Sequence, residues 1–356
     1  MPLSTSPPKH HWILPFAACA SDDWLPAVTA LAPAGFRHFG KLLQGMKLTH
    51  TDKGDACSLS PPHERVLART LGLEADDGLI PWAAWHHLQA GGTPANRGWA
   101  HITPCHWVVG QEHATLTDPT ALGLPEDASR ALLAAMQPYF ETHGITLHYV
   151  EPTRWLAEGD IFRTLPTASL DRVLGRQVDA WLPGASNVEA SKRSAGPPQA
   201  SSGPPGGSEA DTVASVGARQ MRLLQNEMQM LLYTHPVNDQ RASQGQLSVN
   251  SFWISGSGAL PETWTSPPIA PEITMPRSLA QATFNDDGAG YTQAWAALDA
   301  QEGASLLAQQ QRGRTVRLSL CGERNALIFE SARPGIFARI TNVFYQQPLM
   351  VVLEQL

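Results

Sequence analysis

The sequence predicts an α/β protein with a mixed sheet core and an inserted α+β region. Segments with strand and helix patterns alternate along most of the chain, and one hairpin-rich stretch interrupts them in the middle. The chain has 356 residues, which is enough for two modest domains or one large one. Hydrophobic residues make up 42% of the chain and charged residues only 16%, so we expect packed elements joined by long irregular segments.

The first part of the predicted core covers residues 1–97. Its apolar run HWILPFAA is interrupted by Pro15 and followed by acidic residues, which favours a first buried strand over a secretory signal. The segment SLSPPHERVLARTLGL predicts a helix that Ser60 opens, with Pro61 and Pro62 in its first turn. No apolar run reaches the roughly 20 residues that a membrane span needs.

The predicted inserted region covers residues 98–258. The segments HITPCHWVVG and HATLTD predict two strands joined by residues 110–113. The segment LPEDASRALLAAMQPYFETHG predicts a helix with acidic residues in its first turn, and ITLHYV predicts the next strand. Pro, Gly, Ser and Ala then dominate the stretch at about 184–216, which we expect to be a disordered loop because it has little apolar surface to bury.

A helix is predicted directly after this loop. Met221, Leu224, Met228 and Leu231 follow one another at steps of three, four and three, which places them on one helix face. Ser215 is the expected N-cap, and His235 before Pro236 marks the end. We interpret this face as core, although methionine-rich faces also serve as adaptable partner surfaces.

The last residues of the inserted region combine polar and aromatic side chains. The segment HPVNDQR predicts a loop, SVNSFWIS a strand and GSG a tight turn. His235, Asn238, Arg241 and Asn250 are our candidate anion-binding residues, because arginine holds a phosphate or carboxylate with a fork of donors. The alternative is a purely structural loop in which Asn238 and Asp239 cap a short turn.

The second part of the predicted core covers residues 259–356. A Pro-rich irregular segment precedes the turn NDDG, for which a metal-binding carboxylate pair is a second interpretation. We then expect a helix at 291–311, strands at 315–322 and 325–331, a helix at 337–347 and a last strand at 348–356.

The four cysteines lie far apart and form no C-x-x-C pair, which indicates reduced thiols in a cytoplasmic protein. In HITPCH, a strand would place His101 and Cys105 on one face and His106 on the other, from which a zinc site could start. Because two further ligands would have to come from elsewhere, we expect no metal site and interpret these residues as strand packing.

The charge distribution argues against nucleic acid as a partner. The net charge is −7 and the isoelectric point is near 6.0. The sequence shows neither a basic stripe nor a basic recognition helix, so direct DNA reading has no support.

Several segments between Gly98 and Gly258, read in order, resemble the insertion region of archaeal-type cofactor-independent phosphoglycerate mutases, which belong to the alkaline-phosphatase superfamily. The best matching pieces are HPVN with Arg241, Asn250, and Trp253 with Gly256 and Gly258. Over its whole length, through HWILPFAA, GWAHITPCHWVVG and RLSLCGER, the chain resembles the RpfE-type regulatory proteins of bacteria. The resemblance implies a distantly phosphoglycerate-mutase-like core.

The sequence departs from the mutase where the chemistry should be. The mutase's first strand runs into Asp-Gly-x-Gly-Asp and a later segment supplies Asp-His-Gly. Here the first strand runs into Ala20-Ser21-Asp22-Asp23-Trp24, and Asp-His-Gly does not occur. The segment that resembles the mutase's substrate-gripping Arg-x-Asn strand reads Thr103-Pro104-Cys105-His106, without the arginine.

We therefore expect a regulatory or binding protein on a degenerate phosphoglycerate-mutase-like scaffold, without the two-metal site and without a cofactor, whose partner is a phosphorylated small molecule or a protein. The alternative is a phosphoglycerate mutase or phosphatase-like enzyme with a rearranged manganese or magnesium site. Its candidate residues would be Asp22, Asp23, His101, His106, Asp118, Asp171 and His235.

Overall fold

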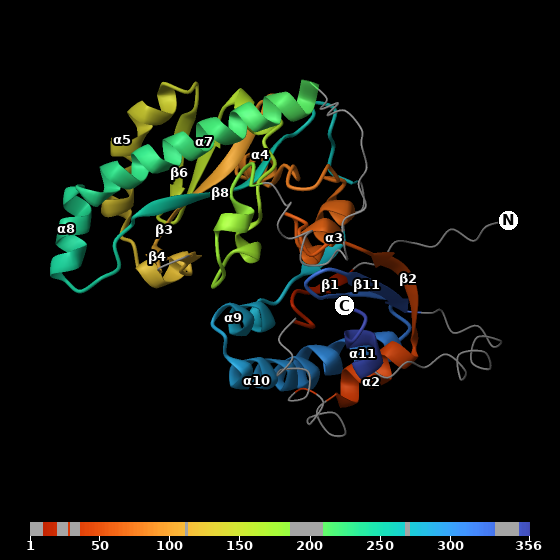
Figure 1. Ribbon diagram of the computed structural model, residues 1–356. Helices are drawn as coiled ribbons and strands as arrows, with labels where there is room; N and C mark the ends of the chain where they lie inside the picture. Colours follow the sequence, from red (N-terminus) through yellow and green to blue (C-terminus); the bar gives the residue numbers. More distant parts are fainter. Residues whose placement is uncertain are drawn as a thin grey trace, which may run out of the picture. The chain divides into compact units, whose positions relative to one another are not determined.

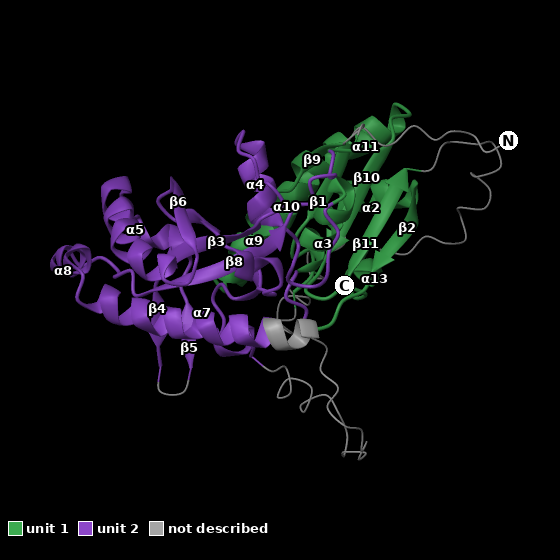
Figure 2. Ribbon diagram, turned by 90° about the horizontal axis from the view of Figure 1, so that it is seen from above, with its two compact units in different colours: residues 1–56, 61–72, 266–356 green, residues 57–60, 73–265 purple. Residues whose placement is uncertain are grey.

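The computed structural model describes residues 10–19, 28, 36–110, 113–185, 209–267, 271–331 and 349–356. These residues fall into two compact units, which Figure 2 shows in different colours. The first unit comprises residues 1–56, 61–72 and 266–356, and the second comprises 57–60 and 73–265. The second unit therefore contains the whole of the 98–258 region and also residues on either side of it.

The first unit is built on a five-stranded mixed sheet with the strand order β2-β11-β10-β1-β9. β1 runs parallel to β10 and to β9, whereas β10 with β11 and β11 with β2 are antiparallel. The mixed sheet that the sequence predicts is therefore present. The strands are β1 (His10–Leu14), β2 (Met46–Asp52), β9 (Glu272–Thr274), β10 (Val316–Cys321) and β11 (Ala326–Ser331).

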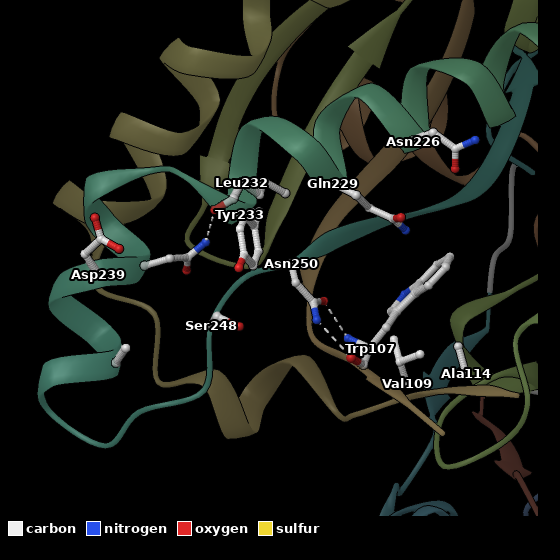
Figure 3. Close-up of a pocket in the computed structure, with 12 residues that line it drawn as sticks. Trp107, Val109, Ala114, Asn226, Gln229, Leu232, Tyr233, Asp239, Ser248 and Asn250 are labelled. Carbon is white, nitrogen blue, oxygen red and sulfur yellow. Dashed lines mark hydrogen bonds between the residues drawn. The ribbon is translucent and has the colours of Figure 1, made fainter. Parts of the chain in front are cut away.

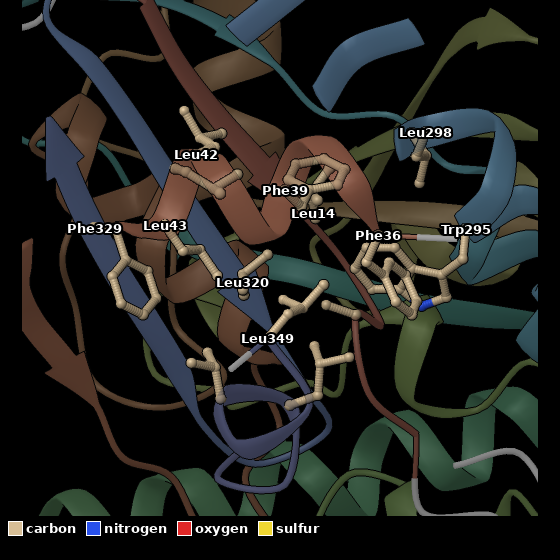
Figure 4. Close-up of a cluster of buried hydrophobic side chains, with 14 of the residues drawn as sticks. Leu14, Phe36, Phe39, Leu42, Leu43, Trp295, Leu298, Leu320, Phe329 and Leu349 are labelled. Carbon is tan, nitrogen blue, oxygen red and sulfur yellow. The ribbon is translucent and has the colours of Figure 1, made fainter. Parts of the chain in front are cut away.

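Helices cover both faces of this sheet, and the strand β1 is therefore buried on both sides. Leu14 of β1 packs into a cluster with Phe39 and Trp295, which Figure 4 shows. Ile13 points the other way and packs with Val66. The helices of the unit are α2 (Arg37–Gln44), α3 (Pro62–Leu71), α9 (Ser278–Phe284), α10 (Gly288–Leu298), α11 (Ala304–Gln311) and α13 (Leu349–Leu353), and a π-helical turn (Asp299–Gly303) joins α10 to α11.

The second unit is built on a four-stranded antiparallel sheet with the order β6-β7-β3-β8. Figure 1 labels β3, β6 and β8 of this sheet. α5 packs against β6, α7 against β8, and α4 against β3 and β8. The sheet strands are β3 (Gly98–Cys105), β6 (Thr146–Glu151), β7 (Arg154–Glu158) and β8 (Ser251–Ala259), and the separate pair is β4 (Trp107–Val109) with β5 (Ala114–Leu116). The main helices are α4 (Trp82–Gln89), α5 (Glu126–Glu141), α7 (Glu209–Tyr233) and α8 (Pro236–Ser243).

The methionine-containing face of α7 belongs to the core of this unit. Met221, Leu224 and Met228 are at most 1% exposed and pack in a cluster with Phe140 and Phe252. The core interpretation of this face is therefore confirmed. Together the two units give the predicted α/β protein with a mixed sheet and an α+β region.

The helix after the predicted loop begins earlier than expected. α7 starts at Glu209, so Ser215 lies inside the helix and is not its N-cap. Residues 186–208 of the predicted 184–216 loop lie outside the described residues.

The C-terminal strand prediction is wrong. Leu349–Leu353 forms the helix α13, in which Leu349, Val352 and Leu353 are buried at helical spacing. A short apolar run does not distinguish a buried strand from a buried helix turn. The helix expected at 337–347 lies outside the described residues, and β9 is a three-residue strand within a segment expected to be irregular.

The GSG sequence is not a turn, because β8 continues through it to Ala259. A Cβ atom at Gly258 would lie 2.6 Å from the Leu79 carbonyl oxygen, and one at Gly256 would lie 2.9 Å from Trp82 Cβ. Both glycines also have positive φ angles, of 60° at Gly256 and 152° at Gly258. They let the strand pass close to the segment before α4.

None of the four cysteines forms a disulfide bond, and Cys105 and Cys321 are buried. Among the described residues, no helix combines the length and the apolar character that crossing a membrane requires.

Candidate binding cavity

A cavity of about 680 Å³ opens on the second unit beside the predicted anion-binding residues. Figure 3 shows it beneath α7, between α8 on one side and the β4–β5 pair on the other. Its lining residues are Trp107, Val109, Ala114, Asn226, Gln229, Leu232, Tyr233, Asn238, Asp239, Ala242, Ser248 and Asn250.

The HPVNDQR segment forms the helix α8, so its prediction as a loop is wrong. His235 is the N-cap, and its Nδ1 accepts a hydrogen bond of 3.2 Å from the Val237 amide. Pro236 occupies the first helical position, where its missing amide proton costs nothing. Desolvation lowers the pKa of His235, against a smaller opposing effect of the Asp239 carboxylate, and this favours the neutral ring that the cap requires.

Asn238 joins three segments of the backbone. Its side-chain Nδ2 donates to the carbonyl oxygens of Leu232 and Val249, each at 2.8 Å. Its Oδ1 accepts from the Val249 amide, also at 2.8 Å. Both of its donor hydrogens and its carbonyl oxygen therefore hold the end of α7, α8 and the approach to β8 together.

Arg241 is buried and also serves the backbone. Its Nε donates to the Leu247 carbonyl oxygen at 2.7 Å, and its Nη2 donates to the Leu122 carbonyl oxygen. Its Nη1 is buried without a hydrogen-bond partner among the described residues. Burial lowers the pKa of Arg241. The guanidinium is not among the groups that line the cavity.

The Asn250 side chain makes the hydrogen bonds to Trp107 that a neighbouring strand would otherwise make. Its Oδ1 accepts from the Trp107 amide at 2.7 Å, and its Nδ2 donates to the Trp107 carbonyl oxygen at 2.9 Å. Figure 3 shows both bonds. The side chain thus satisfies both outward-facing backbone groups of one residue of β4.

The structure brings Asn238 and Asn250 to the cavity wall. His235 caps α8 and Arg241 lies in α8, but neither lines the cavity. Among the described residues that line the cavity, Asp239 is the only acidic or basic one. An anion in the cavity would therefore meet a carboxyl group and amide groups, but no cation among these residues.

Sequence reasoning missed Asn226, Gln229 and Tyr233, which line the cavity from α7. They follow one another at steps of three and four, which places them along one flank of the helix. The spacing can be seen in the sequence. It indicates a cavity-lining face only once the buried face of α7 is known.

The two histidines of the HITPCH segment have other partners. His101 Nε2 lies 2.9 Å from His86 Nδ1, and His106 Nδ1 lies 2.8 Å from the Ser248 carbonyl oxygen. Burial lowers the pKa of both His86 and His101 and raises the pKa of the Cys105 thiol. Within either unit taken by itself, no three described His, Cys, Asp or Glu side chains come close enough to hold a metal ion.

The other candidate residues of the enzyme alternative are also dispersed. Asp118 caps a 3-10 turn by accepting from the Thr120 amide at 2.8 Å, and Asp171 lies in the turn Leu170–Arg172. Asp22 and Asp23 lie outside the described residues. In NDDG, Asp287 caps α10 by accepting from the Gly290 amide, which confirms the turn.

The sequence matches no protein-family model and no curated protein. Two solved structures are similar over most of the chain. The cofactor-independent phosphoglycerate mutase from Thermoplasma acidophilum is 12% identical, with a TM-score of 0.35 over 91% of this chain and 90% of that one. The PH0037 protein from Pyrococcus horikoshii is 10% identical, with a TM-score of 0.40 over 91% of this chain and 87% of that one. At these values the likeness is distant and carries no argument about activity.

Proposed function

We propose that this chain is a regulatory or binding protein, and that the cavity between α7, α8 and β4 is its binding site. The observation that carries the proposal is the chemistry of the cavity wall. The wall combines aromatic and aliphatic groups with the amide side chains of Asn226, Gln229, Asn238 and Asn250; the apolar groups come from Trp107, Leu232 and Val109. Such a lining suits a ligand that is neutral or cationic and partly apolar.

Under this proposal, Asn238 and Arg241 stabilise the backbone around the site and do not bind the ligand. The donors of Asn238 and the Nε and Nη2 groups of Arg241 already bond to backbone carbonyl oxygens. Breaking these bonds to hold an anion would leave carbonyl groups without their donors, and each carbonyl that is buried would cost about 1–3 kcal/mol. A protein partner therefore fits the cavity better than a phosphorylated small molecule.

The regulatory part of the proposal rests on the resemblance to the RpfE-type proteins in the sequence. A regulatory protein with this cavity would act by binding, without a metal-dependent transfer step of its own. The dispersed positions of His101, His106, Asp118 and His235 support this view, because each has a local hydrogen-bond partner.

The cavity can be tested with a neutral fluorescent probe, N-phenyl-1-naphthylamine. Ala242 is exposed on α8 and lines the cavity, so Ala242→Trp fills the site without entering the core. We expect saturable probe binding to the wild type and at least a tenfold loss of affinity in Ala242→Trp. Ser243→Trp is the matched control, because Ser243 is exposed beside Ala242 and does not line the cavity.

Two results would contradict the proposal. One is equal probe binding by Ala242→Trp and Ser243→Trp, which would place the binding elsewhere. The other is manganese-dependent interconversion of 3- and 2-phosphoglycerate that disappears in His235→Ala, which would establish the enzyme alternative.

A further inference from the structure

Successive residues of β4 alternate in direction, so that the backbone groups of one residue face β5 and those of the next face away from it. The Thr117 amide donates to the His106 carbonyl oxygen, and the Gly110 amide donates to the His113 carbonyl oxygen. In an antiparallel pair with this register, Val108 faces Thr115 as the next hydrogen-bonded pair. The amide and carbonyl groups of Trp107 and Val109 must therefore point away from β5.

The opposite edge of β5 is already covered. The Leu116 amide donates to the Arg176 carbonyl oxygen, and the Val178 amide donates to the Ala114 carbonyl oxygen. The free edge of this small sheet is consequently the outer edge of β4.

That edge is only partly satisfied by the protein itself. β3 and β8 pair as far as Cys105 and Ser251, and the segment 246–249 makes no backbone hydrogen bond to β4. The Asn250 side chain bridges the start of the gap by bonding both backbone groups of Trp107. One step further along β4, the backbone of Val109 has no hydrogen-bond partner among the described residues, and its side chain is 76% exposed.

We propose that an extended peptide segment of a partner protein adds to this edge of β4 and lies in the cavity. The segment would take the Val109 amide and carbonyl groups as its pairing partners, continuing the strand-like bonds that Asn250 makes to Trp107. Its inward side chains would pack on Trp107 and under Tyr233, whose ring is 82% exposed.

The charge of the cavity defines the segment further. Asp239 is exposed and is the only acidic or basic residue among the described ones that line the cavity, so a lysine or arginine side chain in the peptide would complement it. The amide of Asn226 lies on the same wall and can bond to a peptide backbone group. The occupant is therefore an extended segment with small apolar residues and a basic residue.

This inference rests on the proposed function, since it names the ligand of the same cavity. The test uses the blocked peptide acetyl-Lys-Val-Thr-Val-Thr-Val-amide, titrated into the full chain by isothermal calorimetry. A version with glutamate in place of lysine and a version N-methylated at its valines serve as comparison peptides. We expect the lysine peptide to bind, the glutamate peptide to bind several-fold more weakly, and the N-methylated peptide to lose binding.

Variants of the protein separate backbone pairing from packing. Val109→Pro removes the amide donor at an exposed edge position where proline is tolerated, and Val109→Ala keeps the donor while removing side-chain surface. We expect Val109→Pro to weaken the lysine peptide about threefold or more relative to Val109→Ala. Asp239→Asn should weaken the lysine peptide and reduce its preference over the glutamate peptide. The thermal unfolding midpoint of each variant confirms that it is folded.

Equal affinity of Val109→Pro and Val109→Ala for the lysine peptide would overturn the pairing at β4. A normal response of the cavity to the neutral probe, with no peptide binding, would overturn the inference while leaving the proposed function intact. If neither the neutral probe nor the lysine peptide binds, the proposed function and this inference are both wrong.

Discussion

At the scale of single residues, the side chains of Asn238, Arg241 and Asn250 bond to the protein backbone, although their residue types suggest an anion site. The residue types of Asn238, Arg241 and Asn250 indicate an anion site, because their donors suit an anion. Asn238 and Asn250 line a cavity, whereas Arg241 does not. Their donors point to backbone carbonyl oxygens, and this direction depends on the turn between α7 and α8, which residue types alone do not define.

Removing the Arg241 guanidinium should therefore cost stability. Arg241→Ala leaves the Leu122 and Leu247 carbonyl groups without their donor, and we expect a loss of about 2–4 kcal/mol in the free energy of unfolding. Urea unfolding measures this, with the exposed neighbour Gln240→Ala as the control. An Arg241→Ala variant as stable as the wild type would show that the guanidinium is free to serve a ligand.

At the scale of elements, periodicity predicted the strongly patterned helices and strands but not the breaks between them. The α7 core face and the strands β10 and β11 follow directly from spacing. The glycines of β8 were misread, because their role depends on a segment more than 150 residues earlier in the chain that passes within contact distance. The helix α13 was misread because five apolar-rich residues fit either period.

The close approach at Gly258 gives a prediction for this element. Gly258→Ala would place a Cβ atom 2.6 Å from the Leu79 carbonyl oxygen and 3.0 Å from Pro81, so the strand or the neighbouring segment must move. We expect a larger loss of unfolding free energy than in Gly245→Ala. Gly245 also has a positive φ angle, of 67°, but has open space around it, so its substitution should cost only about 1 kcal/mol. Equal effects in chemical denaturation would show that the contact can relax.

At the scale of the whole molecule, buried histidines link stability to pH. In the first unit, His11 lies between Ser319 and Thr70, with its ring nitrogens 2.8 Å and 3.2 Å from their hydroxyl oxygens. Desolvation, with a smaller effect of Arg317, lowers the pKa of His11 from 6.5 to about 3. The unfolded chain therefore binds a proton below pH 6.5 that the folded chain does not take up until about pH 3.

Stability should consequently fall as the pH decreases through this window. The His11 contribution is fully present above pH 6.5, and we expect about 2 kcal/mol of it to be lost between pH 7 and pH 5. Urea unfolding at the two pH values, compared between the wild type and His11→Asn, isolates this contribution. An identical pH dependence in the two proteins would show that His11 titrates normally.

The alternation of strand and helix patterns predicted an α/β protein with a mixed sheet, because each pattern is local. The nature of the cavity could not be predicted in this way, since it depends on how α7, α8 and β4 pack together. The wall is chemically unlike a phosphate site even though the residues around it were chosen for that chemistry.

The most direct test of this account is a nuclear magnetic resonance titration of the isotope-labelled protein with the lysine peptide and, separately, with 3-phosphoglycerate. The account predicts that the peptide shifts the Val109 amide and the Asn226 side-chain signals, while 3-phosphoglycerate leaves them and the Arg241 Nε signal unchanged. Saturable shifts of the Arg241 Nε and Asn238 side-chain signals with 3-phosphoglycerate would contradict it, because they would show that these donors leave their carbonyl partners for a phosphate.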